Sequence, residues 1–247
     1  MASAVGSYCR QEASGQEQQE REARERAQRE AQQAREAAER DRLEKQAAAD
    51  ALQKQQQSAN ECDRLAANPT DSRKTGEGVP FDLLKRQADQ AFEACTKAVQ
   101  TFPSELRYQY QLGRAAQFKD KKQAFDIFAR LVQVNYAAAF DNLGGMYLYD
   151  RKDAATAIQL FKRGSQLGDA DSMVSLVDLI DKGLVPTPDP EQTKLALLNR
   201  AAELGHSGAQ RGYELELQKA NQAQISQATQ QQMMQMFGAF IQGVARR

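Results

Sequence analysis

The chain has 247 residues, enough for one or two domains, and its 33 basic and 33 acidic side chains give a formal net charge of zero. This balance excludes a sequence-wide attraction to nucleic acid or to anionic membranes. The helix formers alanine, glutamine and glutamate are abundant, and branched aliphatic residues do not alternate in runs. We therefore predict an all-α protein that does not bind nucleic acid.

Composition divides the chain into four segments. Residues 1–61 are expected to form a charged helix or a disordered segment, and residues 62–80 a linker. Residues 81–215 are expected to form a helical-repeat domain, followed by an amphipathic C-terminal helix or tail over residues 216–247. The sequence as it begins shows neither a signal peptide nor an apolar run of ~20 residues. It is therefore expected in the cytoplasm, whereas a misplaced start would place it in the periplasm.

Residues 16–60 are a low-complexity block that cannot bury a core. Its only large apolar side chains, Leu43 and Leu52, have a spacing that fits no heptad. Glutamate and arginine recur four residues apart, as in Glu20 and Arg24, and each such pair stabilises a helix by about 0.2–0.5 kcal/mol. We expect a solvated single helix. The alternative is a coiled coil through the alanine positions, with self-association through residues 16–60.

An irregular segment and an amphipathic helix follow this block. Residues 66–80 contain two prolines and two glycines without apolar periodicity, which predicts a linker or loop. From Phe81 to Val99, apolar residues recur at spacings of three and four, which predicts a helix with one buried face.

The region from residue 81 to residue 215 contains a repeat. Three helix-to-helix junctions align without gaps, at residues 135–144, 168–177 and 205–214, and their first residues lie 33 and 37 apart. Periods of this length with paired helices are typical of a helical solenoid. Asn135, Gly168 and Gly205 are expected to end a helix in the left-handed conformation. In the preceding helices, Gly113 and Gly144 are expected to let the partner helix approach closely.

This pattern resembles the tetratricopeptide superfamily, and more closely its Sel-one-like repeat subclass. The stretch "DKGLVPTPDPEQTKLALLNRAAELGHSGAQ" carries the clearest likeness. The resemblance implies a short α-solenoid of helix pairs, preceded here by the long charged helix. The third unit departs from the pattern at Val177, and the fourth at Glu214, where a packing glycine is expected. The matching residues are Gly183, Val185, Asp189, Ala196, Ala201, Ala202, Gly205 and His206.

A weaker resemblance concerns "ECDRLAANP" and "ACTKAVQTFPSELRYQYQLGRA". These stretches are similar to the start of repeat regions in bacterial proteins that also carry a caspase-like peptidase domain. The resemblance implies a bacterial origin. It does not imply a peptidase, because the α/β core of such an enzyme has no counterpart in this sequence.

No constellation of catalytic or metal-binding residues is found in the sequence. His206 is the single histidine, and the three cysteines are not spaced as a zinc site. We expect a protein that is not an enzyme and uses neither cofactor nor metal. His206 is expected at a turn open to solvent, where replacement by aspartate leaves the fold nearly intact. Cys62 and Cys95 form a disulfide if the chain is exported, and otherwise remain thiols.

The expected function is that of a protein–protein interaction scaffold that binds a partner peptide or helix in the concave groove. The groove is expected to run from basic to acidic; the alternative is that its residues are merely solvated helix faces. Two rival functions are a non-catalytic part of a caspase-like peptidase system and an envelope-associated structural protein. By the tetratricopeptide resemblance, the groove residues are Arg107, Tyr110, Arg114, Gln117, Asp141, Asp171, Asp178 and Asp181.

The C-terminal segment carries an apolar stripe that ends in Arg246 and Arg247. Three interpretations remain open: a cap on the last repeat, a self-association contact, or contact with a membrane surface or partner helix through residues 233–247. The stripe consists of Met233, Met234, Met236, Phe237, Phe240, Ile241 and Val244.

Overall fold

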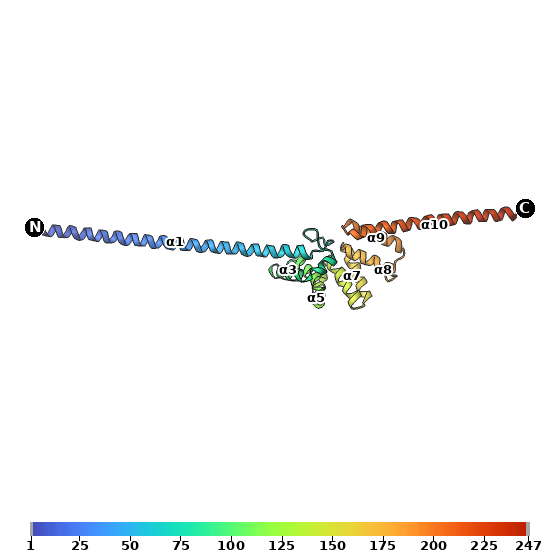
Figure 1. The fold of residues 1–247 in the computed structure, drawn as a ribbon, viewed down its shortest axis with the longest axis horizontal. Helices are drawn as coiled ribbons and strands as arrows, with labels where there is room; N and C mark the ends of the chain where they lie inside the picture. The colour runs from blue at the N-terminus through green and yellow to red at the C-terminus, as the bar shows by residue number, and fades with distance from the viewer. Residues whose placement is uncertain (1, 246–247) are drawn as a thin grey trace. The chain divides into compact units, whose positions relative to one another are not determined.

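The computed structural model describes residues 2–245, without the side chains of residues 2–17, 58, 238–240 and 242–245. Over this range the regular elements are all helical, as predicted (Figure 1). They are α1 (Ala2–Ala66), α2 (Phe81–Arg86), α3 (Ala88–Thr101), α4 (Leu106–Ala116), α5 (Lys121–Gln133), α6 (Ala137–Gly145), the π-helical turn η1 (Met146–Asp150), α7 (Ala154–Gln166), α8 (Ala170–Asp181), α9 (Pro190–Glu203) and α10 (Ser207–Ala245).

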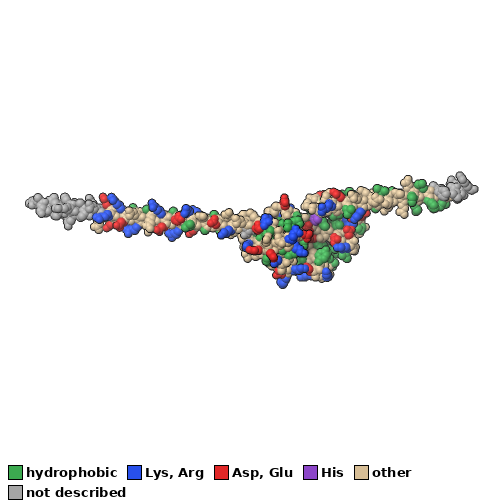
Figure 2. All heavy atoms as spheres, viewed as in Figure 1, with side chains coloured by type: hydrophobic (Ala, Val, Ile, Leu, Met, Phe, Trp, Pro, Cys, Tyr) green, Lys and Arg blue, Asp and Glu red, His purple; other side chains and the backbone are tan. Residues whose placement is uncertain are grey.

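The chain divides into two units, residues 1–56 and residues 57–247. In the first unit, α1 is a helix whose described side chains are all exposed. Ion pairs link its turns, including Arg24 to Glu20 and Arg26 to Glu22, at the predicted spacing of four residues. Figure 2 shows basic and acidic side chains interleaved along this helix. Such pairs stabilise an isolated helix without a buried face.

The second unit is a short α-solenoid. Each helix from α3 to α10 packs against the next, and α6 also contacts both α4 and α8. These three helices therefore form one layer, the first helix of each pair, and α5, α7 and α9 supply the second helices. The last turns of α1 belong to this unit, because Cys62 and Leu65 are buried in its core.

Turn residues and packing glycines confirm the predicted repeat. Asn135, Gly168 and Gly205 have φ angles of 55°, 85° and 89°, the left-handed conformation that ends a helix. A Cβ atom at Gly144 would lie 2.5 Å from Cε1 of Phe161 on the facing helix. Only glycine allows α6 and α7 to approach this closely.

Aspartates fix the starts of the second helices. The carboxylates of Asp120, Asp153 and Asp189 accept hydrogen bonds from backbone amides three residues further on, at the N-termini of α5, α7 and α9. Asp169 caps α8 in the same way. Each cap satisfies an otherwise unpaired amide of the first turn and is worth about 1 kcal/mol.

The segment expected to be a linker is an ordered loop. Val79 donates a backbone hydrogen bond of 2.7 Å to the carbonyl of Ala67, so residues 67–79 form a compact loop with closed ends, here called the Ω loop. Gly78 has a φ of 86°, and a Cβ atom there would lie 2.5 Å from the backbone of Pro69. Asn68 and Asp71 are buried, so the loop packs on the solenoid.

Two features of the last helix differ from the sequence interpretation. The glycine that packs in the fourth repeat is Gly212, where a Cβ would lie 3.1 Å from Leu198, and Glu214 is exposed. The first part of α10 packs on α9 up to Ala220, whereas residues 221–237 are all exposed. The described part of the apolar stripe therefore does not fold back as a cap on the last repeat. Among the residues described, no helix has the length and apolarity needed to cross a bilayer.

Candidate partner-binding cleft

A cleft of about 620 Å³ lies in the second unit, on the face of the α4, α6 and α8 layer. The Ω loop, the start of α2 and the turn before α10 also line it. The aromatic side chains of Phe81 and Tyr149 are exposed at the cleft. The residues that border the cleft include Asn68, Thr70, Phe81, Arg114, Gln117, Asp141, Gly145, Met146, Tyr149, Asp171, Val174 and His206.

Polar contacts attach the Ω loop to the solenoid. The Asn68 side-chain amide donates to the Tyr110 hydroxyl at 3.0 Å and to the Asp171 carboxylate at 2.8 Å. Thr70 donates its hydroxyl proton to the same Asp171 oxygen at 2.7 Å. Because Tyr110 lies on α4 and Asp171 on α8, the loop spans the layer of first helices.

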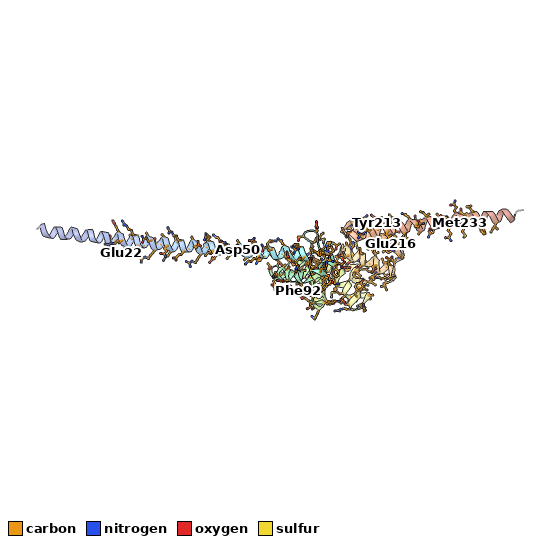
Figure 3. The ribbon with its side chains drawn as sticks, in the orientation of Figure 1. Glu22, Asp50, Phe92, Tyr213, Glu216 and Met233 are labelled. Carbon is orange, nitrogen blue, oxygen red and sulfur yellow. A yellow bond between two sulfur atoms is a disulfide. The ribbon has the colours of Figure 1, made fainter. Side chains whose placement is uncertain are left out.

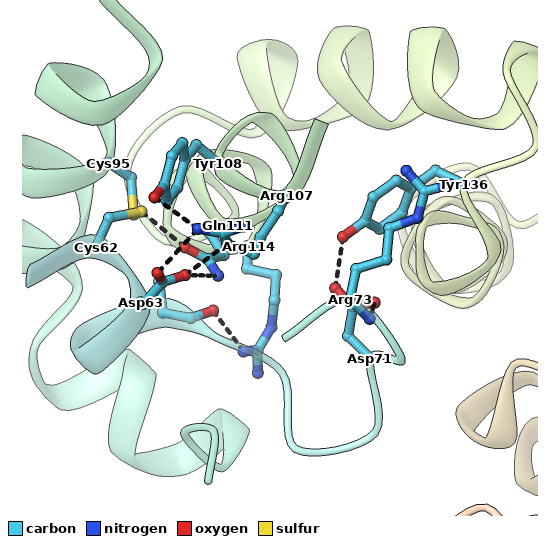
Figure 4. A network of polar contacts seen from close by, with 11 residues as sticks. Cys62, Asp63, Asp71, Arg73, Cys95, Arg107, Tyr108, Gln111, Arg114 and Tyr136 are labelled. Carbon is cyan, nitrogen blue, oxygen red and sulfur yellow. Dashed lines mark hydrogen bonds and ion pairs between the residues drawn. A yellow bond between two sulfur atoms is a disulfide. The ribbon is translucent and has the colours of Figure 1, made fainter. Parts of the chain in front are cut away.

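A second set of contacts fixes the far part of the loop. The Tyr136 hydroxyl donates to the Asp71 carboxylate at 2.5 Å (Figure 4). The Arg73 guanidinium lies over the Tyr136 ring, 5.1 Å from its centroid. Burial and the Asp71 charge raise the pKa of Tyr136 far above its ordinary value, so this hydroxyl keeps its proton and acts as a donor.

Arg114 closes the base of the loop. Its side chain is 3% exposed, and Figure 4 shows its guanidinium beside the end of α1. The guanidinium donates to the carbonyls of Ala66 at 2.7 Å and Val79 at 3.0 Å. Burial lowers the pKa of this guanidinium, while Tyr110, Asp171 and Asp71 act in the opposite direction. Although Arg114 borders the cleft, its donors point to the ends of the Ω loop.

The end of α1 is tied to the solenoid by a disulfide and an ion pair. Cys62 is joined to Cys95 of α3, and both are fully buried. The neighbouring Asp63 accepts two hydrogen bonds from Arg107, at 2.9 and 3.2 Å (Figure 4). Gln111 donates to the same carboxylate at 2.8 Å. The structure thus contains the disulfide that the sequence left as one of two alternatives.

The eight residues expected to line one groove separate into two sets. Arg114, Gln117, Asp141 and Asp171 border the cleft. The other four have different positions. Arg107 is paired with Asp63, and Tyr110 is fully buried. Asp178 and Asp181 are exposed and pair with Lys182 and Lys194, respectively.

The expected gradient from basic to acidic is therefore absent from the cleft. Arg107 does not border the cleft and pairs with Asp63, and Arg114 donates its hydrogen bonds to the backbone carbonyls of Ala66 and Val79. Asp141, Asp150 and Asp171 are the acidic residues that border it. Asp150 is paired with Lys121, and the donors of Arg114 are directed at backbone carbonyls, so Asp141 and Asp171 are the carboxylates that the cleft offers to a cation.

Asp141 is the carboxylate most strongly affected by its surroundings. Burial and the charge of Asp171 raise its pKa to about 7, opposed by the hydrogen bond that Ser175 donates at 2.6 Å. Burial and these two carboxylates also raise the pKa of Asp169, which caps α8 behind the cleft. A cationic group placed beside Asp141 would favour its charged form.

His206 differs from the expected solvent-exposed turn residue. Its Nδ1 accepts a hydrogen bond from the Ala209 amide at 3.0 Å, so it caps the start of α10. Its Nε2 lies 3.5 Å from the Asp171 carboxylate, and the side chain is only 22% exposed. His206 therefore borders the cleft and contributes to its structure.

Sequence reasoning missed the contribution of the Ω loop to the cleft. Asn68, Thr70 and Phe81 lie in or next to a stretch without periodicity, and nothing in it indicates which helix it contacts. Within the described residues, no group of three or more histidine, cysteine, aspartate or glutamate side chains is arranged to hold a metal ion. The cleft thus offers carboxylates that can bind a cation, beside exposed aromatic rings.

No family model and no curated protein matches this chain. Among solved structures, the chain is similar to a Sel1 repeat protein from Oxalobacter formigenes, with 23% sequence identity and a TM-score of 0.42. The similar region covers 52% of this chain and 58% of that protein. The chain thus spans little more than half of that protein's length.

Proposed function

We propose that this protein is a non-catalytic adaptor of the Sel-one-like repeat class, which binds an extended segment of a partner protein in the cleft. The observation that carries the proposal is a cleft of about 620 Å³ bordered by three consecutive first helices of the solenoid. Solenoid proteins commonly use such a concave surface for binding. The repeat spacing and the glycines at the turns and helix contacts support the class.

The charge of the cleft favours a basic partner segment. Asp141 and Asp171 lie on successive first helices, and the donors of Arg114, the arginine that borders the cleft, are directed at backbone carbonyls. A lysine or arginine side chain between the two carboxylates would form charge-assisted hydrogen bonds, which are stronger than neutral ones. Because the Asp141 pKa is about 7, binding of a cation is expected to release a proton near neutral pH.

The apolar borders of the cleft favour a peptide over a small cation. Phe81 and Tyr149 are exposed rings, and Met146 and Val174 lie on the helices between them. Aromatic residues are enriched among the residues that dominate protein–protein binding energy. A segment with a basic side chain flanked by apolar residues would match this combination.

Site-specific photo-crosslinking tests the proposal and identifies the partner. A photoreactive residue at position 145 would project into the cleft, because no atom lies within 4 Å of a Cβ built at Gly145. The matched control carries the same residue at Gln159, an exposed position on α7 that does not border the cleft. We expect a crosslink to one protein from position 145 only. Equal crosslinking from both positions, or none from position 145, would refute the proposal.

The disulfide favours the envelope as the site of action. Disulfides persist in oxidising compartments and are rare in the cytosol, and the Cys62–Cys95 bond is fully buried. Among the rival functions, this observation supports an envelope-associated protein. Labelling of free thiols in the protein isolated from its native host, under denaturing and non-reducing conditions, tests this point. Two reactive thiols at positions 62 and 95 would contradict an oxidising location.

A further inference from the structure

The outer part of α10 extends beyond the solenoid without packing on it. Tyr213 and Glu216 contact α9, where Glu216 pairs with Lys194 at 2.7 Å. From Asn221 to Phe237 every side chain is exposed. Figure 3 labels Tyr213 and Glu216 on the packed part of the helix and Met233 beyond it. Among the side chains that the structure describes, none of this unit therefore covers residues 221–237, here called the outer helix together with residues 238–245.

This outer helix lacks the charges that solvate α1. No charged residue lies between Lys219 and Arg246. Figure 2 shows hydrophobic and uncharged side chains along it, in contrast to the interleaved charges of α1. An isolated helix in water needs either pairs of opposite charge or a partner for its apolar face. Because residues 221–245 contain no charged side chain, they depend on a partner for their apolar face.

The apolar residues form one stripe on this helix. At 100° per residue, Met233, Phe237 and Ile241 fall on the same side, and their side chains are 65%, 66% and 52% exposed. By sequence, Phe240 and Val244 continue the stripe, and the spacing of 233, 237, 240 and 244 alternates between four and three. This spacing is typical of the contact line between two helices. On the opposite side lie Gln231, Gln235 and Gln242.

The charge pattern selects the kind of partner. Helices that lie on a membrane surface usually have lysine and arginine along their polar face, whereas the polar face here is glutamine. A charged partner helix would find no side chain of opposite charge between Lys219 and Arg246. A second copy of the same helix meets neither repulsion nor an unpaired charge. With Met236 beside them, the stripe residues Met233, Phe237, Phe240, Ile241 and Val244 make six apolar side chains. At roughly 100 Å² each they would bury about 1,200 Å² in a pair of copies, which is the lower limit for a stable interface.

We propose that residues 221–245 are a self-association helix, which packs against the same segment of a second copy through the stripe centred on Met233 and Phe237. This inference does not depend on the cleft or on its partner. It makes the protein a dimer that presents two clefts.

The test is the mass of the full-length protein in solution, measured by light scattering after size exclusion over a range of concentrations. The stripe variant carries Met233→Glu and Phe237→Glu. The control variant carries Gln231→Glu and Gln235→Glu, which add the same charge to the opposite side of the same helix. We expect twice the monomer mass for the wild type and the control, and the monomer mass for the stripe variant.

Four results would overturn the proposal. They are a monomeric wild type at all concentrations, a stripe variant that remains dimeric, a control that dissociates equally, and a wild type larger than a dimer. Sedimentation with neutral and anionic phospholipid vesicles distinguishes the membrane alternative. We expect the protein to stay in the supernatant, and binding of a monomeric wild type to either vesicle would also overturn the proposal.

Discussion

The side-chain amide of Asn68 donates a hydrogen bond of 2.8 Å to the carboxylate of Asp171, 103 residues further along the chain. This contact joins the Ω loop to α8, and Thr70 reinforces it on the same oxygen. The loop thereby becomes a wall of the cleft, and Asp171 is partly engaged before any partner binds. Asp141 accepts one hydrogen bond, from Ser175, whereas Asp171 accepts bonds from both Asn68 and Thr70, so Asp141 is expected to keep more capacity to accept from a partner's cation.

The adjacent glycines Gly144 and Gly145 provide a matched test of the helix contacts in the solenoid. In Gly144→Ala, the new Cβ meets Cε1 of Phe161 at 2.5 Å, so we expect overpacking that lowers the free energy of unfolding by about 1–3 kcal/mol. In Gly145→Ala the new Cβ meets open space, so the higher helix propensity of alanine should stabilise the fold by about 0.5–1 kcal/mol. Urea denaturation measures both effects. Equal effects of the two substitutions would contradict the described packing.

Arg114 is expected to stabilise the fold and not to contact a partner directly. Arg114→Met removes both hydrogen bonds that close the Ω loop and leaves the carbonyls of Ala66 and Val79 unpaired. We expect a loss of about 2–4 kcal/mol in the free energy of unfolding. Gln117→Met, at a more exposed position of the same cleft, serves as the control and should cost less than half as much. Two variants of equal stability would show that Arg114 does not hold the loop.

The disulfide should contribute strongly to stability. Cys62 and Cys95 are 33 residues apart, and the chain-entropy relation assigns about 3–4 kcal/mol to closing a loop of this length. We therefore expect Cys95→Ser to lower the denaturation midpoint markedly. The double variant Cys62→Ser/Cys95→Ser should cost about the same as either single variant, since both remove one bond. Additive costs would indicate two independent thiols.

The raised pKa of Asp141 predicts a pH dependence of stability. The folded protein holds this proton up to a pH of about 7, whereas an unfolded aspartate releases it near 3.8. The folded state then binds more protons than the unfolded state in this interval, so the Asp141 contribution to stability falls as the pH rises from about 4 to about 7. Asp141→Asn removes the charge, and its melting temperature relative to the wild type should therefore increase from pH 5 to pH 8.

Asp126→Asn is the control for this measurement. The hydrogen bond from Lys122 lowers the pKa of Asp126, so this carboxylate is ionised in both the folded and the unfolded state throughout the interval from pH 5 to pH 8. The difference in melting temperature between Asp126→Asn and the wild type should stay constant there. A constant difference for Asp141→Asn as well would contradict the raised pKa.

The sequence predicts the repeat because each repeat contains its own signals. Helix ends need a residue that tolerates a positive φ, and Asn135, Gly168 and Gly205 supply it at related positions. Close helix packing needs glycine opposite a large ring, as Gly144 and Phe161 show. These requirements are local or recur with the repeat, so spacing in the sequence is enough to find them.

The cleft depends on contacts that spacing does not encode. The Ω loop carries no periodicity, and its attachment to Asp171 is a tertiary contact between distant parts of the chain. Arg114 has the position of a groove residue in its repeat, yet it is buried because the loop covers it. Of the four predicted groove residues that do not border the cleft, Tyr110 contacts this loop, Arg107 pairs with Asp63 of α1, and Asp178 and Asp181 pair with lysines, all through contacts that helix spacing does not encode.

The central claim is that the cleft binds a basic segment of a partner protein. Its most direct test is the affinity of the partner identified by crosslinking, measured by titration calorimetry with the wild type, Gly145→Arg and Gln159→Arg. Arginine at position 145 fills the cleft with a bulky cation, whereas arginine at position 159 adds the same group outside it. We predict at least a tenfold loss of affinity, or about 1.4 kcal/mol, for Gly145→Arg and unchanged affinity for Gln159→Arg. Equal affinities for all three proteins, at equal melting temperatures, would contradict the claim.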